Sequence, residues 1–320
     1  MLRRPRFLAA AVLAAASLAL TTLPASGASS AAIPAVVIAP TWVPVPSYTA
    51  AKHDEPITYA NGCHAKGVVT TPIVCTFNAS GGRTVMLFGD SHANHWYGAV
   101  LNAARVGGWK FKTMTKSGCP AVTVSVRRYK SSSYYPECNT WRARALANLQ
   151  SVKYGRIDVL VISTWQFHQV LTSTYGSNLS GAAKFAKWET GLRSALGKAL
   201  TGVRQIVILR DSPDLPGDMV QAQACYARYG QAAQTKCGST LSKAMSAGIW
   251  AAEKRAAASF PGRVTAVDLT TRHCANSWCG PIDGPYLAFK DDNHWTQTWV
   301  KARMNQPVYS LVKAAMARAA

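Results

Sequence analysis

Acidic side chains are scarce in this chain. It contains 14 Asp and Glu residues against 35 Lys and Arg, which gives a formal net charge of +21. The positive residues are spread along the chain, and no single basic tract dominates. A basic protein outside the cytoplasm suits an anionic surrounding such as a cell wall or an acidic glycan. The alternative is a generally basic, solvated surface with no special partner.

Long apolar runs are also lacking beyond Leu23, so no later segment is long and apolar enough to span a membrane. The N-terminus has three arginines, then an apolar run from Phe7 to Leu23, then small residues. This order is typical of a secretory signal peptide, which we place at residues 1–28. An uncleaved anchor is the alternative, and both predict a secreted or cell-envelope protein. Export also argues against nucleic acid as the partner.

The sequence has no Cys-x-x-Cys couple, which argues against a structural zinc site. Its eight cysteines suit an oxidising compartment, where disulfides persist. Eight cysteines allow 105 connectivities, and we expect the one that joins sequence neighbours. The expected pairs are Cys63 with Cys75, Cys119 with Cys138, Cys225 with Cys237, and Cys274 with Cys279.

Residues 29–62 are rich in Ala, Pro, Ser and Thr and predict a linker or extended arm. After it, short apolar runs alternate with stretches of helical spacing, without internal repeats. This alternation predicts one α/β domain over 63–320, a three-layer α/β/α sandwich with a mostly parallel, flavodoxin-like sheet of about five strands. The expected strands are Thr84–Phe88, Trp109–Met114, Asp158–Ser163, Gln205–Leu209 and Val264–Leu269.

The expected helices cover about 92–106, 139–152, 181–200, 239–259 and 295–317. Three long connections, 116–138, 211–238 and 270–293, each hold one cysteine couple. In a parallel sheet these connections leave the carboxyl ends of strands, where ligands bind in such folds. The disulfides would then stiffen the loops that carry a site.

The first candidate site is the turn after the strand Thr84–Phe88, which reads Gly89-Asp90-Ser91-His92. Gly89 permits a tight turn, and Ser91 stands where a helix begins and free N–H groups are available. Its hydroxyl would be exposed beside donors suited to an oxyanion. The alternative is that Ser91 is only the N-cap of the helix.

A second candidate site lies just before the last helix, where Asp291 and His294 are three residues apart. At this spacing the carboxylate reaches the Nδ1–H of the histidine and leaves Nε2 free to take a serine proton. Asp292 and Asn293 are close enough to serve instead. A calcium-binding or capping cluster is the alternative.

Together these segments resemble the SGNH (GDSL-like) hydrolase superfamily, whose first block is Gly-Asp-Ser and whose last is Asp-x-x-His. The chain is most similar to the SGNH domains associated with bacterial membrane acyltransferases. There the first block reads Gly-Asp-Ser-His and a Ser-Gly-Cys-Pro loop follows the second strand, as in 117–120 here. A cysteine-rich approach to Asp-Asp-x-His closes the domain. The resemblance covers about 83–317.

The resemblance implies a catalytic triad in which Ser91 is the nucleophile, His294 the general base and Asp291 the acid that orients it. It also implies an oxyanion hole from the N–H groups of Ser91 and Gly118. The superfamily has Gly-x-Asn-Asp after the third strand, whereas this chain has Ser-Thr-Trp-Gln at 163–166. The third donor is therefore open. Candidate substrate or oxyanion groups are Asn94, Trp165 and Gln166.

We therefore expect an exported serine esterase or O-acyltransferase that acts on cell-envelope glycans or small esters through an acyl-enzyme. No cofactor or metal is expected. The expected partners are an acylated glycan and a membrane acyltransferase, and the chain is expected to be a monomer. Two alternatives stay open. One is a basic glycan-binding protein on an SGNH frame, and the other is a metal-dependent phosphoesterase, which also uses a Gly-Asp-x-His block.

Overall fold

The computed structural model describes residues 44–216 and 222–320. The predicted signal peptide and the first part of the predicted arm lie outside the described residues. From residue 44 onward the arm lies against the domain. Val45 exchanges backbone hydrogen bonds with Pro285 and Leu287, and the Asp54 carboxylate accepts the N–H of Thr298 at 2.8 Å. The arm carries α1 (Tyr48–Ala51) and the short 3-10 turn η1 (Ile57–Tyr59).

A mostly parallel sheet forms the centre of the domain. The strand order is β1-β4-β3-β5-β6-β8, with β2 antiparallel beside β4. The five predicted strands are β3, β4, β5, β6 and β8, and their order is flavodoxin-like, as expected. The bounds are β1 (His64–Ala65), β2 (Cys75–Asn78), β3 (Thr84–Gly89), β4 (Lys110–Lys116), β5 (Ile157–Ser163), β6 (Val203–Leu209) and β8 (Val264–Val267).

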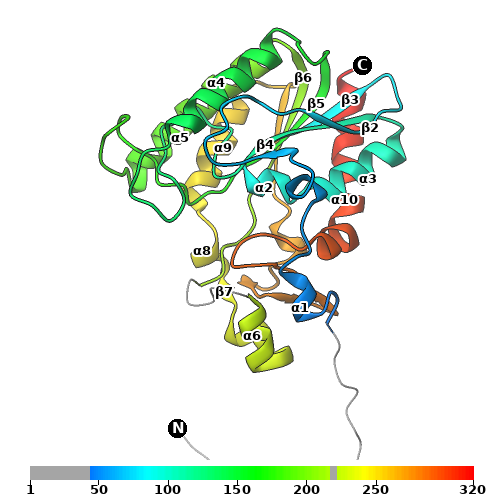
Figure 1. The fold of residues 1–320 in the computed structure, drawn as a ribbon, viewed down its shortest axis with the longest axis vertical. Coiled ribbons are helices and arrows are strands. Elements are labelled where there is room, and N and C mark those ends of the chain that lie inside the picture. Colours follow the sequence, from blue (N-terminus) through cyan, green and yellow to red (C-terminus); the bar gives the residue numbers. More distant parts are fainter. Residues whose placement is uncertain (1–43, 217–221) are drawn as a thin grey trace, which may run out of the picture. The chain divides into compact units, whose positions relative to one another are not determined.

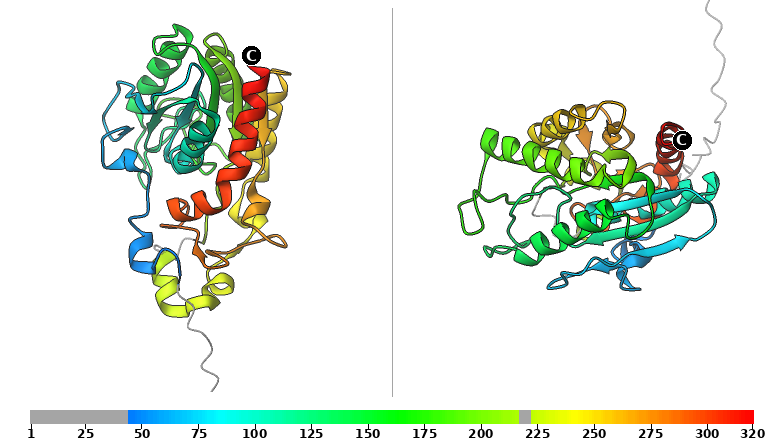
Figure 2. Two further views of the ribbon diagram at one scale, coloured as in Figure 1. Left: turned by 90° about the vertical axis from the view of Figure 1, so that its right-hand side faces the viewer. Right: turned by 90° about the horizontal axis from the view of Figure 1, so that it is seen from above.

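Helices cover both faces of this sheet, which gives the predicted three layers (Figures 1 and 2). The bounds of the covering helices are α2 (Ser91–Asn94), α3 (Tyr97–Gly107), α4 (Pro136–Gln150), α5 (Gly181–Ala199), α9 (Ala247–Ala258) and α10 (Gln297–Arg318). Alternate residues of β3 point to opposite faces. Val85 and Leu87 pack with α3 and α10, whereas Met86 and Phe88 pack with α4, α5 and α9.

Three features differ from the prediction. The segment expected to be one helix over 239–259 instead contains β7 (Ser239–Thr240), α8 (Leu241–Ala244) and α9 (Ala247–Ala258). The helix expected over 92–106 is divided into α2 and α3 near His95 and Trp96. The segment 63–78 adds two short edge strands, β1 and β2, beside the five expected ones. Neither could be seen as an apolar run, because β1 has two residues and β2 is only partly buried.

Short elements fill the loops beyond the carboxyl ends of the strands (Figure 1). They are α6 (Ala222–Tyr229), η2 (Gly230–Ala232), α7 (Ala233–Lys236), β7 (Ser239–Thr240), α8 (Leu241–Ala244), η3 (Thr270–Arg272), β9 (Trp278–Cys279), β10 (Ile282–Asp283) and β11 (Tyr286–Leu287). The described part of the chain has no helix that is both long and apolar enough to cross a membrane.

Four disulfides join the cysteines in the expected nearest-neighbour pairs. They are Cys63–Cys75, Cys119–Cys138, Cys225–Cys237 and Cys274–Cys279. Three of them stand in the long connections at the carboxyl ends of strands. The Cys119–Cys138 bridge is fully buried and ties the loop after β4 to the first turn of α4.

Replacing Cys119 and Cys138 together by Ala should lower the free energy of unfolding by about 2–5 kcal/mol, since the bridge closes a loop in the unfolded chain. Denaturant unfolding of the exported protein measures this. The same unfolding curve in the wild type and the double variant would show that the bridge contributes nothing.

Candidate active site

Ser91 stands at a sharp turn between the buried strand β3 and the helix α2. Gly89 has φ of 144°, and a Cβ there would collide with the carbonyl oxygen of Ser163. Asp90 is the N-cap of α2, because its side chain accepts the N–H of His92 at 2.8 Å. Ser91 is therefore not the cap, and its hydroxyl is left for other contacts.

His294 meets that hydroxyl across 203 residues of sequence: its Nε2 lies 2.9 Å from Ser91 Oγ. Its Nδ1 lies 2.9 Å and 3.0 Å from the two carboxylate oxygens of Asp291. Asp291 Oδ1 also accepts the backbone N–H groups of Asn293 and His294. The turn before α10 thus fixes the carboxylate and the ring relative to each other.

The protonation state of Asp291 follows from these contacts. Burial by itself raises the pKa of this carboxyl, but the charge and hydrogen bond of His294 hold the pKa well below its usual range. A carboxylate that stays ionised can orient the imidazole and stabilise its protonated form. Asp292, the other acid we considered, contributes its backbone carbonyl to Leu215 and makes no hydrogen bond to the His294 ring among the described residues.

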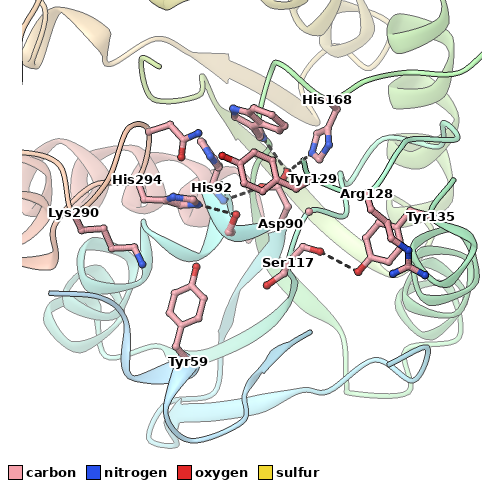
Figure 3. Close-up of a pocket in the computed structure, with 14 residues that line it drawn as sticks. Tyr59, Asp90, His92, Ser117, Arg128, Tyr129, Tyr135, His168, Lys290 and His294 are labelled. Atoms are coloured by element: carbon pink, nitrogen blue, oxygen red, sulfur yellow. Dashed lines mark hydrogen bonds and ion pairs between the residues drawn. The ribbon is translucent and has the colours of Figure 1, made fainter. Parts of the chain in front are cut away.

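A cavity of about 390 Å³ opens over Ser91 and His294. Figure 3 shows His294, His92 and Lys290 on one side of it and Tyr135 and Arg128 on the other. Aromatic rings form much of its wall, and two cationic side chains lie at its edge. The wall residues are Tyr59, Tyr129, Tyr135, Trp165, Arg128 and Lys290.

The two residues predicted to supply the oxyanion hole both line this cavity. Gly118 has φ of 61°, which favours glycine, and it lies two residues after the end of β4. The Tyr135 hydroxyl donates to the carbonyl of Ser117 at 3.2 Å and so holds this loop against the cavity. Ser91 and Gly118 thus stand at the ends of the neighbouring strands β3 and β4.

Of the three further candidates, only Trp165 lines the cavity. Its indole N–H donates to the Asp214 carboxylate at 3.0 Å, so it is already engaged. The Gln166 amide is buried and donates to the carbonyl of Ser212 at 3.1 Å. Asn94 is fully buried and accepts the Thr58 hydroxyl at 2.8 Å. Gln166 and Asn94 therefore support the loops behind the cavity and do not face it.

Two buried histidine–carboxylate pairs lie beneath the site. His168 Nε2 is 2.8 Å from Asp90 Oδ2, and the same oxygen accepts the N–H of Trp165. His92 Nδ1 is 2.6 Å from Asp211 Oδ1, and its ring centroid lies 4.5 Å from that of His294. No local motif predicts the bond between His92 and Asp211, because 119 residues separate them.

Sequence reasoning also missed the aromatic wall residues Tyr59, Tyr129 and Tyr135. Tyr59 comes from the arm, and the other two come from the loop between β4 and α4, so no motif marks them. Asp211 could have been noticed, since it follows the apolar strand β6 at the edge where ligands bind. The described residues contain no group of three or more His, Cys, Asp or Glu side chains placed to hold a metal ion.

Comparisons with known proteins agree with the fold and assign the domain family. A family model for the SGNH domain that is fused to AT3 domains matches residues 62–304. No curated protein matches the chain. Among solved structures, the periplasmic domain of a lipopolysaccharide acetyltransferase from Salmonella ser. Paratyphi A aligns with a TM-score of 0.51 at 13% identity, over 80% of this chain and 88% of that one. At 13% identity this similarity shows a shared fold and nothing about activity.

The pair of His92 and Asp211 makes a testable prediction. Burial lowers the pKa of His92, but the adjacent Asp211 carboxylate outweighs burial and raises it to about 9. Since this pKa lies above the ordinary value of 6.5, the pair stabilises the fold fully below pH 6.5, and the contribution fades as the pH rises through about 9. In an NMR titration of the histidine rings, His92 should therefore stay protonated at pH 7.5.

The variant Asp211→Asn removes the carboxylate that raises the pKa of His92 most and leaves burial, with Asp90 and Asp214 still present, so this pKa should fall well below its wild-type value. A His92 ring that titrates near 6.5 in both proteins would contradict this account of the pair.

Proposed function

The chain belongs to the family of SGNH domains that are fused to AT3 domains. From this membership we propose that it is an exported serine enzyme that transfers or hydrolyses acyl groups on cell-envelope glycans or related esters. The acyl group that we propose first is O-acetyl. One observation carries the proposal. Ser91 Oγ, His294 Nε2 and the Asp291 carboxylate form a continuous hydrogen-bonded line with separations of 2.9 Å, at the mouth of a cavity. This is the geometry that a nucleophile, its base and an orienting acid require.

The first half of the reaction forms an acyl-enzyme. His294 Nε2 takes the proton of Ser91 as Oγ attacks the carbonyl carbon of the ester. The N–H groups of Ser91 and Gly118 would hold the negative oxygen that develops, a role supported by the place of both residues in the lining of the cavity. His294 then gives its proton to the leaving alcohol, and the acyl group remains on Ser91.

The second half returns the serine to its free form. A water molecule or a sugar hydroxyl attacks the acyl carbon, and His294 takes its proton and passes it to Ser91 Oγ. Water gives hydrolysis and a sugar hydroxyl gives transfer, with the same three residues. The two outcomes differ in how well the cavity excludes water and holds the acceptor.

The surroundings of Ser91 favour a carbohydrate substrate. Tyr59, Tyr129 and Trp165 line the cavity with aromatic rings against which a sugar can pack, and Arg128 lies at its edge. Four disulfides and the signal peptide predicted at residues 1–28 support a place outside the cytoplasm. We propose an acylated glycan as substrate, a membrane acyltransferase as the partner that supplies acyl groups, and a monomeric chain.

A non-catalytic glycan-binding protein is the second candidate. One observation favours it. Trp165 stands at the position where the wider superfamily has asparagine, and the amide of the next residue, Gln166, donates to the carbonyl of Ser212 and does not line the cavity. The triad argues for the enzyme, since a binding protein would have no need of three aligned catalytic groups.

Replacing Ser91 or His294 by Ala should lower kcat/KM for p-nitrophenyl acetate by roughly 10³-fold or more, and the double variant should lose little beyond that, because triad members act as a unit. Asp291→Asn should cost less than either, since this carboxylate orients and stabilises but transfers no proton. Steady-state hydrolysis measures all four variants, and circular dichroism checks that they fold.

Asp292→Asn is the matched control. It changes the same residue type in the same turn, but its carboxylate makes no hydrogen bond to His294, so activity should stay within about twofold of the wild type. Near wild-type activity in a folded Ser91→Ala protein would refute Ser91 as the nucleophile. A folded wild type that binds glycans but cleaves no ester would instead favour the glycan-binding protein.

A further inference from the structure

A second concave site lies apart from the catalytic cavity, near α8 and the first turns of α9 (Figure 1). It is a groove of about 700 Å³, and none of its lining residues lines the cavity over Ser91. Two tryptophans, two cations and a rim of small polar side chains make up its chemistry. The principal residues are Arg210, Trp250, Lys254, Trp278, Ser242 and Asn276.

The cations of the groove gather around Trp250. The Arg210 guanidinium lies 5.6 Å from the centroid of this ring, and the Lys254 ammonium lies 5.9 Å from it. Both separations are within the range in which a cation is attracted to an aromatic ring. Trp250 therefore holds two positive groups at one place in the groove, whose lining includes no Asp or Glu.

The Arg210 side chain is held in place by one carboxylate and keeps further N–H groups that can donate hydrogen bonds. It is only 10% exposed, and Nη1 donates to the Asp268 carboxylate at 2.6 Å. Its Nε is buried and has no partner among the described residues, so this group is not offered to a ligand. The Nη groups carry four N–H donors, and the bond to Asp268 leaves others of these for a ligand oxygen. Asp268 also accepts the Thr270 hydroxyl and backbone N–H, which turns the carboxylate toward its own loop.

Trp278 gives the groove a fixed apolar face. Its indole N–H donates to the carbonyl of Gln234 at 2.7 Å, which sets the orientation of the ring. The hydroxyl and amide groups of Ser242 and Asn276 stand on the rim. An aromatic face beside hydroxyl-binding groups suits a sugar ring, and paired cations suit an acidic group on that sugar.

The groove lies close to the catalytic end of the sheet. Gly89 of β3 pairs with Ser163 of β5, and Ile162 pairs with Ile208 of β6, so Arg210 follows β6 at the same level as the Ser91 turn. Two strand spacings, roughly 10 Å, separate these backbone positions. A chain of a few sugar units covers such a distance.

We propose that this groove is a secondary binding site for an acidic oligosaccharide, with the sugar acid at Arg210 and Lys254 and a sugar ring against Trp278. The site would hold a glycan chain while another part of it is acylated or deacylated at Ser91. The connection between the groove and the reaction at Ser91 rests on the proposed function, whereas binding of the oligosaccharide in the groove does not.

Isothermal calorimetry with tetragalacturonate as an acidic probe and maltotetraose as a neutral one tests the groove. Wild type and Ser91→Ala should bind tetragalacturonate equally, because the catalytic serine is not part of the groove. Lys254→Gln and Trp250→Ala should each weaken binding about threefold to tenfold, and maltotetraose should bind more weakly than the acidic probe. Turnover of p-nitrophenyl acetate should be unchanged in Lys254→Gln.

Lys313→Gln is the matched control, since Lys313 is exposed and lies 5.8 Å from the Tyr309 ring on α10. It should bind the probe as the wild type does. The proposal is overturned if Lys313→Gln loses as much affinity as Lys254→Gln, if Trp250→Ala binds normally, or if maltotetraose binds as tightly. Binding that depends on Lys254 without any ester cleavage would refute the proposed function and leave the groove standing.

Discussion

The hydrogen bond between Ser91 and His294 is the contact on which the account of this domain depends. It joins the end of β3 to the turn before α10, two points separated by 203 residues. Both points are fixed independently. Gly89 and the Asp90 cap set the serine, and Asp291 sets the histidine through its ring and the backbone of its own turn. The sheet then needs only to bring two rigid turns together.

Buried polar pairs support these turns from below. A carboxylate withdrawn from water is costly unless it is hydrogen-bonded and paired. Asp90 meets this condition through His168 and the N–H groups of Trp165 and His92. Because Asp90 also caps α2, the same bonds that satisfy its charge hold the residue next to the nucleophile. The loop after β5, where the wider superfamily has asparagine, thus serves here to secure the nucleophile turn.

The fold could be predicted from the sequence because its five main strands are continuous apolar runs between stretches of helical spacing. The Ser91 and Asp291–His294 segments could be singled out because each is a short local motif. The bond between His92 and Asp211 could not be predicted from the sequence, because 119 residues separate the two and only the strand order β3-β5-β6 brings them together. The break between α2 and α3 was missed because helical spacing continues through it. Tyr59 belongs to an arm whose composition suggested little structure.

The central claim is that Ser91 is a nucleophile activated by His294. The most direct test is covalent trapping with a serine-directed phosphonate, followed by peptide mass spectrometry of the folded protein. The account predicts a single adduct on the peptide that contains Ser91, formed equally in the presence of EDTA, and much slower labelling in the His294→Ala protein. Labelling on another residue, or none on Ser91 in a protein that still cleaves esters, would contradict it.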